Sequence, residues 1–127
     1  MTEADPHIAK ARRFLDMARL SLTGDFDEMA GRDAYLAAYH AALAYIAVHD
    51  PDAPKTHRGV HNRFSMVAKD DPRVDAEFVT FLARAIVIKN AADYSTDPNV
   101  TKPQAEAAIA TAAKFVDAIS SIVTPPP

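Results

Sequence analysis

Five segments of this chain repeat apolar residues every three or four positions, and this periodicity constrains the fold more than any other feature. The segments cover about 6–22, 27–48, 56–68, 74–92 and 101–123. Such spacing places the apolar residues on one face of an α-helix, and no segment alternates with the period of two typical of a β-strand. Alanine supplies 26 residues and glycine only 3, which also favours helix. The sequence therefore predicts an all-α, up-and-down antiparallel bundle of about five helices.

The length and the prolines indicate one domain. A chain of 127 residues has room for a single core, so we expect residues 1–127 to form one helical domain. Pro51, Pro54, Pro72 and Pro98 fall between the periodic segments, and residues 124–127 are a proline-rich tail that cannot continue a helix. Alanine faces bury little area per residue, so the core of a monomer is thin and we expect a homodimer.

The candidate core is given by the apolar positions of each segment. These positions are Ile8, Ala11, Leu15, Ala18, Leu22, Tyr35, Leu36, Tyr39, Leu43, Ile46, Val60, Phe64, Val67, Phe78, Phe81, Leu82, Ala85, Ile88, Ile109, Ala112, Val116, Ile119 and Val123.

Composition excludes several classes of function. The formal charge is −3 and the chain has no cysteine, so a uniformly basic surface, disulfides, thiolate metal sites and a cysteine nucleophile are excluded. No apolar run has the roughly 18 to 20 residues that cross a bilayer, and residues 1–13 lack the apolar stretch of a signal peptide. We expect a cytoplasmic protein with no membrane partner, no metal and no cofactor.

Three short motifs stand in a recognisable order. Residues 31–42 read GRDAYLAAYHAA, residues 55–60 read KTHRGV, and residues 90–94 read NAADY. In this order and at these intervals they resemble the HEPN superfamily, the higher eukaryotes and prokaryotes nucleotide-binding domain. The similarity covers roughly residues 8–122 and is greatest to a small prokaryotic branch.

The resemblance implies a bundle of four to five helices that often dimerises. In the wider family, some members are metal-independent ribonucleases, frequently toxins paired with a small nucleotidyltransferase antitoxin, and others only bind nucleotides or RNA. The nuclease signature is an arginine, four to six residues and then a histidine on the same helix, often with a polar residue after the arginine.

This sequence departs from that signature. Lys89 and Asn90 stand for the arginine and the polar residue, and Asp93 or Tyr94 occupies the place of the histidine. Neither residue type titrates near neutral pH as histidine does. The candidate catalytic residues are therefore Lys89, Asp93 and Tyr94 as remnants of the signature, with His40 as a displaced base; an ordinary ion pair between Lys89 and Asp93 is the structural alternative.

Two further clusters are candidates for binding. Arg32, Tyr35 and Tyr39 share one helical stripe with His40 at its edge, which suits either phosphate and base recognition or a buried aromatic stripe. Lys55, Arg58 and Arg63 lie in a stretch without acidic residues, where they either attract phosphate or form a solvated face.

His57 and His61 lie four residues apart and could share a metal ion. Two ligands seldom hold zinc and no third is evident, so structural roles are favoured.

Three hypotheses for function follow. The first is an RNA- or nucleotide-binding protein with a degenerate nuclease motif, acting as one component of a toxin–antitoxin or stress-response pair. The second is a metal-independent endoribonuclease with His40 as base and Arg32 or Lys89 as phosphate cation. The third is a non-catalytic module that docks a minimal nucleotidyltransferase and presents a tyrosine such as Tyr94 for nucleotidylation.

Overall fold

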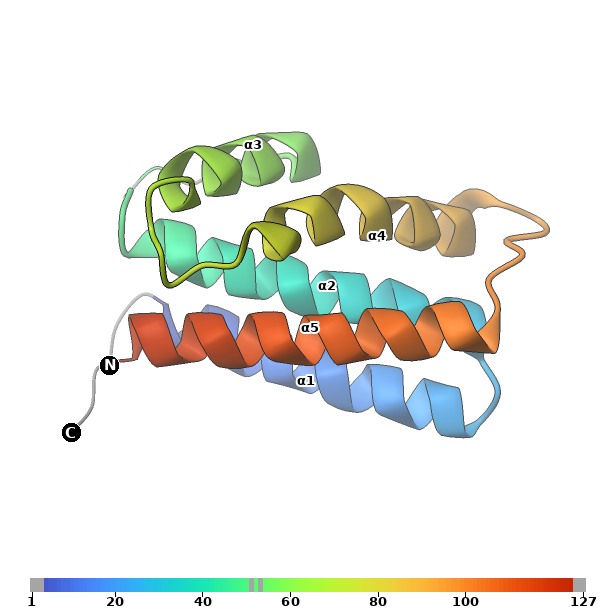
Figure 1. Ribbon diagram of the computed structural model, residues 1–127. Coiled ribbons are helices and arrows are strands. Elements are labelled where there is room, and N and C mark those ends of the chain that lie inside the picture. Colours follow the sequence, from blue (N-terminus) through green and yellow to red (C-terminus); the bar gives the residue numbers. More distant parts are fainter. Residues whose placement is uncertain (1–3, 51, 53, 125–127) are drawn as a thin grey trace.

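The computed structural model describes residues 4–50, 52 and 54–124, and within them it contains five helices and no strand. These are α1 (Asp5–Thr23), α2 (Asp27–Ala47), α3 (His57–Ala68), α4 (Ala76–Tyr94) and α5 (Lys102–Val123). The all-α helical bundle is thus confirmed (Figure 1). Pro51 and the end of the tail, residues 125–127, lie outside the described residues.

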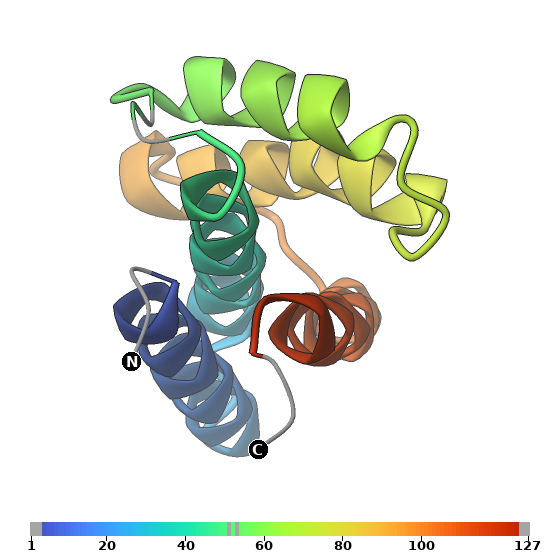
Figure 2. The same ribbon diagram turned by 90° about the vertical axis from the view of Figure 1, so that its left-hand side faces the viewer.

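Helix α2 is the centre of the bundle. It contacts each of the other four helices, with α1 and α5 along one side and α3 and α4 on the other (Figure 2). The apolar periodicity predicts a single buried face for α2, but 13 of its residues are buried, because alanines fill several of its sides. This helix therefore contributes to the core in almost every direction.

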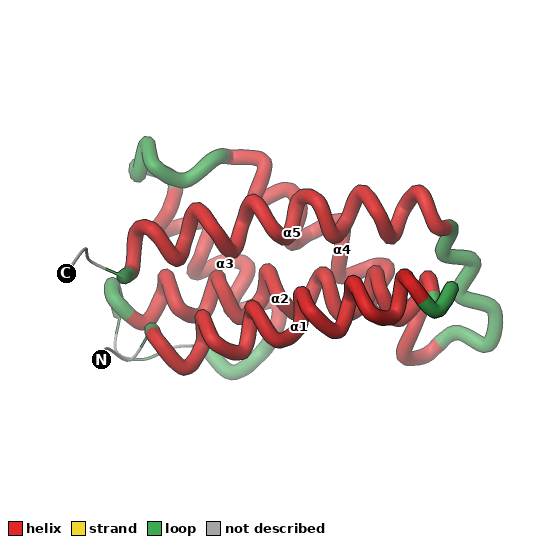
Figure 3. Tube along the Cα trace, turned by 90° about the horizontal axis from the view of Figure 1, so that it is seen from below, coloured by secondary structure: helices red, strands yellow, loops and turns green. Residues whose placement is uncertain are grey.

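Local capping signals set the helix ends. The Thr56 hydroxyl accepts a hydrogen bond from the Gly59 amide at 3.0 Å, as the sequence predicts for an N-cap. Thr101 and Gln104 form a capping box at the start of α5, with Pro103 in the first turn. Helix α4 begins at Ala76 rather than near residue 74, because the Asp75 carboxylate accepts from the Glu77 amide. The connections lie at the helix ends (Figure 3).

The core consists of a few large side chains set among alanines. Tyr35, Tyr45, Phe64 and Phe115 are fully buried, and Phe115 stacks on both Phe64 and Phe78. Most of the expected core positions are buried. Those that remain partly accessible are Leu22, Tyr39, Leu43, Val67 and Ile88.

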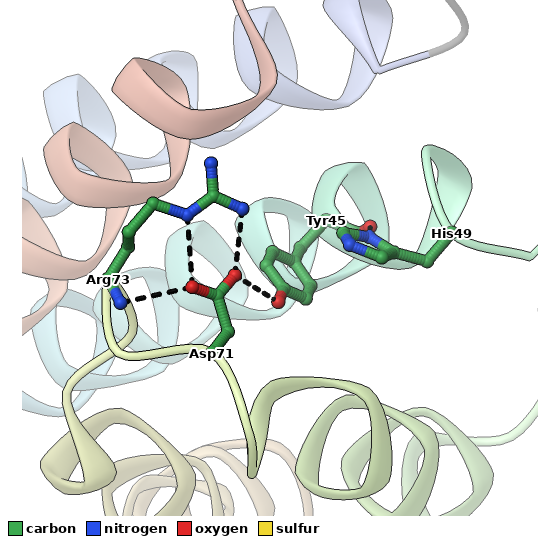
Figure 4. A network of polar contacts seen from close by, with 4 residues as sticks. All are labelled: Tyr45, His49, Asp71 and Arg73. Atoms are coloured by element: carbon green, nitrogen blue, oxygen red, sulfur yellow. Dashed lines mark hydrogen bonds and ion pairs between the residues drawn. The ribbon is translucent and has the colours of Figure 1, made fainter.

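The connection between α3 and α4 is fastened to α2 by a polar network (Figure 4). The Tyr45 hydroxyl donates to the Asp71 carboxylate at 2.7 Å, and the Arg73 side chain donates to both oxygens of the same carboxylate at 2.9 Å. These hydrogen bonds, first from Arg73 and then from Tyr45, hold the pKa of Asp71 well below its usual range. His49 stacks on the Tyr45 ring, so the network also holds the end of α2.

None of the described helices is long and apolar enough to cross a membrane.

Candidate functional site

The three sequence motifs meet on the side of α2 that faces α3 and α4. The Arg32 Nε of the first motif donates to the Asp93 carboxylate of the third at 2.7 Å. The Tyr35 hydroxyl of the first motif lies 2.7 Å from Nδ1 of His57, which belongs to the second. Segments about 20 to 60 residues apart in sequence are thus joined by side-chain contacts.

Asp93 is shared by two cations. Its carboxylate pairs with Arg32 and, at 3.1 Å, with Lys89 one turn earlier on α4. Burial raises the pKa of Asp93, but hydrogen bonds and charge from Lys89 and Arg32 outweigh that effect and lower it. The ion pair that the sequence predicts between Lys89 and Asp93 is present, and Arg32 extends it into a cluster across two helices.

Asp33 balances the cluster on the α2 side. Nη1 of Arg32 donates to its carboxylate at 2.8 Å. Burial is the largest influence on Asp33 and raises its pKa, against the opposing charge of Arg32. The cluster of Arg32, Asp33, Lys89 and Asp93 thus contains two positive and two negative side chains.

Tyr94 lies at the exposed end of the cluster. Its side chain is 79% exposed, and Nζ of Lys89 lies 5.4 Å from the centre of its ring. This cation–π contact orients the ring beside the charges while leaving the hydroxyl and one face open.

Tyr35 is enclosed by two imidazoles. Its hydroxyl lies 2.7 Å from Nδ1 of His57 and 2.7 Å from Nε2 of His61, and burial raises its pKa strongly. Burial also lowers the pKa of both histidines, helped for His57 by the charge of Lys89. Each histidine thus directs one ring nitrogen at Tyr35, and no group of three potential metal ligands occurs within the described ranges.

Tyr39 and His40 continue the row of rings toward α1. Tyr39 stacks on His57 with ring centres 4.2 Å apart, and its edge meets His40. His40 packs against Phe14 and His7 of α1, so the structure places it on the far side of Tyr39 from Lys89 and Asp93. Burial lowers the pKa of His40 to about 4.

The basic residues of the second motif and of the turn after it differ in their ion pairing. Lys55 and Arg58 are exposed on either side of His57 in the chain, and neither forms an ion pair with another described residue. Arg63 pairs with Asp50, so the structural alternative accounts for it.

The charged side chains of the cluster are only 7% to 29% exposed, whereas Tyr94 beside them is open to solvent. A groove of about 220 Å³ lies between α4 and α5, lined by Phe81, Ala85, Ile88 and Ala108 among others. Another lies between the end of α3 and the start of α4.

Sequence reasoning missed the partner of the two histidines and the part played by Asp33. The spacing of His57 and His61 predicts a shared face of α3, but only the packing of α3 on α2 shows that Tyr35 lies between them. No sequence pattern identifies Asp33 as part of the cluster, apart from its place next to Arg32.

Comparison with known families agrees with this convergence of motifs. The HEPN domain family matches residues 4–122, which is nearly the whole chain. The chain belongs to the HEPN family. HEPN domains are associated with nucleotides or RNA, often in toxin–antitoxin systems, and they commonly dimerise. No curated protein matches this HEPN chain.

Proposed function

We propose that this HEPN protein binds RNA or a nucleotide through phosphate, as one component of a toxin–antitoxin or stress-response pair. The observation that supports this is the sharing of Asp93 by Arg32 and Lys89 beside an open tyrosine ring. The cations bind phosphate and the ring of Tyr94 stacks on a base. Because the histidine of the nuclease signature is absent from α4, we assign the cluster a role in binding and not in cleavage.

The cluster retains donors for a ligand although its charges are paired. Arg32 uses Nε and Nη1 for Asp93 and Asp33, and Nη2 donates to neither carboxylate. Lys89 carries three donors and directs one at Asp93. Lys55 and Arg58 add the positive charge that the balanced cluster lacks, so phosphate attraction is expected along the start of α3 and the end of α4.

Binding of a labelled single-stranded RNA, followed by fluorescence anisotropy at several salt concentrations, tests this proposal. Lys89→Ala and Arg58→Ala should each weaken binding, and each lost phosphate contact should reduce the slope of log K against log salt by about 0.7. Lys114→Ala, which removes an exposed cation on α5, is the matched control and should bind as the unmodified chain does. Equal binding by all three variants, or no binding by the unmodified chain, would contradict the proposal.

The exposure of Tyr94 favours a second candidate, docking of a minimal nucleotidyltransferase. A hydroxyl at the end of α4 that is open to solvent is accessible to a modifying enzyme. Co-expression with a nucleotidyltransferase encoded by a neighbouring gene should give a stable complex and add a nucleotide mass to the chain. Tyr94→Phe should abolish the added mass, and an unchanged mass shift in that variant would contradict this candidate.

No contact in the structure supports the hypothesis of a ribonuclease with His40 as the base. His40 packs on α1, whereas Arg32 and Lys89 contact Asp93 at the end of α4. His40→Ala should therefore leave any RNA cleavage unchanged.

A further inference from the structure

A buried tyrosine hydroxyl joins two imidazole rings of α3 to α2. The Tyr35 side chain is fully buried, and its oxygen lies 2.7 Å from Nδ1 of His57 and 2.7 Å from Nε2 of His61. Both distances are at the short end of the hydrogen-bond range. This hydroxyl makes no other hydrogen bond with the described residues. We call the three side chains the Tyr35 triad.

The Tyr35 triad is fully hydrogen-bonded when both rings are neutral. A hydroxyl has one proton, so Tyr35 donates to one imidazole and accepts from the other. If it donates to His61 Nε2, His57 must donate from Nδ1, and both rings carry their proton on Nδ1. If it donates to His57 Nδ1, both rings carry their proton on Nε2. The two neutral histidines therefore have the same tautomer.

One added proton also leaves every group that faces the hydroxyl paired. A charged imidazole carries a proton on both nitrogens and can only donate. It donates to the Tyr35 oxygen, and the hydroxyl then donates to the ring that is still neutral. The triad thus accepts one positive charge, on either His57 or His61, and keeps both hydrogen bonds.

A second charge breaks this arrangement. When both rings are charged, two N–H groups point at the Tyr35 oxygen and the hydroxyl proton has no acceptor. A buried donor without a partner destabilises the folded state, and the two positive charges repel each other across the hydroxyl. The doubly charged triad is therefore incompatible with the packing of His57 and His61 on Tyr35.

The surroundings supply no negative charge that would offset this repulsion. The titratable side chains around the two rings are Tyr35, Tyr39 and His40 on α2, the other histidine on α3, and Lys89 on α4. No described carboxylate is paired with either ring. Burial lowers the pKa of both histidines, and the charge of Lys89 lowers that of His57 further. The charges therefore appear only below about pH 6.5.

The Tyr35 triad holds only the first half of α3. Its histidines lie in the first two turns of the helix, where Val60 is the buried apolar residue. The second half is held by Phe64, which stacks on Phe115 and meets the Tyr45 ring edge-on. Loss of the triad therefore separates residues 57–61 from α2, while Phe64 keeps the end of α3 packed.

We propose that the Tyr35 triad is an acid-sensitive switch that holds the start of α3 on α2. It stays closed with no charge or one charge and opens when His57 and His61 are both charged. The switch responds to the number of charges and not to the charge of one particular ring. It does not depend on the ligand proposed above. Opening separates the first sequence motif from the second and gives solvent access to Tyr35.

The first test is an NMR titration of the full chain labelled with nitrogen-15, from about pH 8 to about pH 4. At neutral pH the two rings should have the same tautomer. In acid, His57 and His61 should titrate in separate steps that lie about one pH unit or more apart. Opposite tautomers, or two rings that titrate together, would overturn the proposal, and neither result requires a variant.

Tyr35→Phe tests the part played by the hydroxyl. This change keeps the buried ring and removes the single proton that the two imidazoles share. The two titration steps should therefore move closer together, with only the repulsion between the rings left to separate them. An unchanged separation would assign the coupling to charge alone and overturn the switch as proposed.

The second test measures the exchange of backbone amide hydrogens in α3 and α5. After correction for the intrinsic effect of pH, residues 60–64 should lose protection about tenfold or more, relative to α5, when the second ring becomes charged. His61→Gln keeps an acceptor for the Tyr35 hydroxyl but cannot be charged, so α3 should stay protected at the same pH. His49→Gln removes an exposed histidine that bonds to its own helix, and this matched control should open as the unmodified chain does.

Two outcomes of the exchange measurement would contradict the switch. Equal loss of protection in α3 and α5 would show that acid unfolds the whole bundle and does not open α3. Equal opening of α3 in His61→Gln and in the unmodified chain would show that the second charge is not required.

Discussion

His40 shows how one half-buried side chain couples stability to pH. Its Nδ1 is buried without a hydrogen-bond partner among the described residues, and its ring stacks on Phe14. Burial disfavours the charged imidazolium, and His7, Lys10 and His57 add to this effect, so the pKa of His40 falls to about 4. His7, His57 and His61 are shifted in the same direction.

These shifts predict loss of stability in acid. Between about pH 6.5 and 4, His40 is protonated in the unfolded chain but remains neutral in the folded protein. The free energy of unfolding therefore falls as the pH falls through this range. Partial exposure reduces the contribution of His40 to about 1 to 2 kcal/mol over that window. His40→Phe keeps the stacked ring and removes the titration, so urea unfolding at several pH values should show a flatter acid dependence. His49→Gln is the control, and an unchanged slope in His40→Phe would contradict the prediction.

At the scale of the helices, the close approach of α2 and α4 positions the charge cluster. Gly31 allows this approach, because a Cβ atom there would lie 2.6 Å from Cγ2 of Ile88. The neighbouring Arg32 and the following Lys89 thereby come within reach of the same carboxylate. The contact is steric, since no described glycine has a positive φ.

Gly31→Ala should therefore destabilise the protein although alanine favours helix. Overpacking costs about 1 to 3 kcal/mol, and the gain in helix propensity offsets at most about 1 kcal/mol of it. Gly31→Ala should also weaken RNA binding, because α4 must move away from Arg32. Ile88→Ala removes the clashing methyl group, so the double variant should be more stable than additivity of the single changes allows. Strict additivity in thermal unfolding would show that the two residues do not clash.

At the scale of the whole molecule, α4 presents a surface suited to a second copy. A stripe of uncharged, exposed side chains runs along its outer face at intervals of three and four residues: Thr80, Ala83, Val87 and Asn90. Stable interfaces bury roughly 1,200 to 2,000 Å², so the groove between α4 and α5 must contribute as well. Pairing along this stripe brings the Lys89 clusters of two copies near each other.

We expect a dimer that depends on this stripe. Val87, which is 66% exposed, should be the sensitive position, and Val87→Glu should give a monomer in analytical ultracentrifugation. Leu20→Glu alters a side chain that is 74% exposed on α1 and should leave the dimer intact. A monomeric unmodified chain, or a dimer that only Leu20→Glu disrupts, would place the interface elsewhere or exclude it.

The sequence predicts more of the fold than of the site. Periodicity and caps such as Thr56 and Thr101 place the helix ends within one or two residues, because these signals are local. The contact between Tyr35 and the two histidines depends on how α3 crosses α2, which no local pattern encodes. The family motifs singled out segments that contact one another in the fold, but the sharing of Asp93 by Arg32 and Lys89 required the structure.

The central place of α2 has a consequence for how this protein can diversify. The helix that fills the middle of the bundle also supplies Arg32, Tyr35 and Tyr39, so a change of ligand made there would put folding at risk. Residues 55–58 and the last turn of α4 lie outside that helix and would contact the proposed ligand from the periphery. Relatives that recognise other ligands should therefore differ first at those peripheral positions and keep the central helix nearly constant.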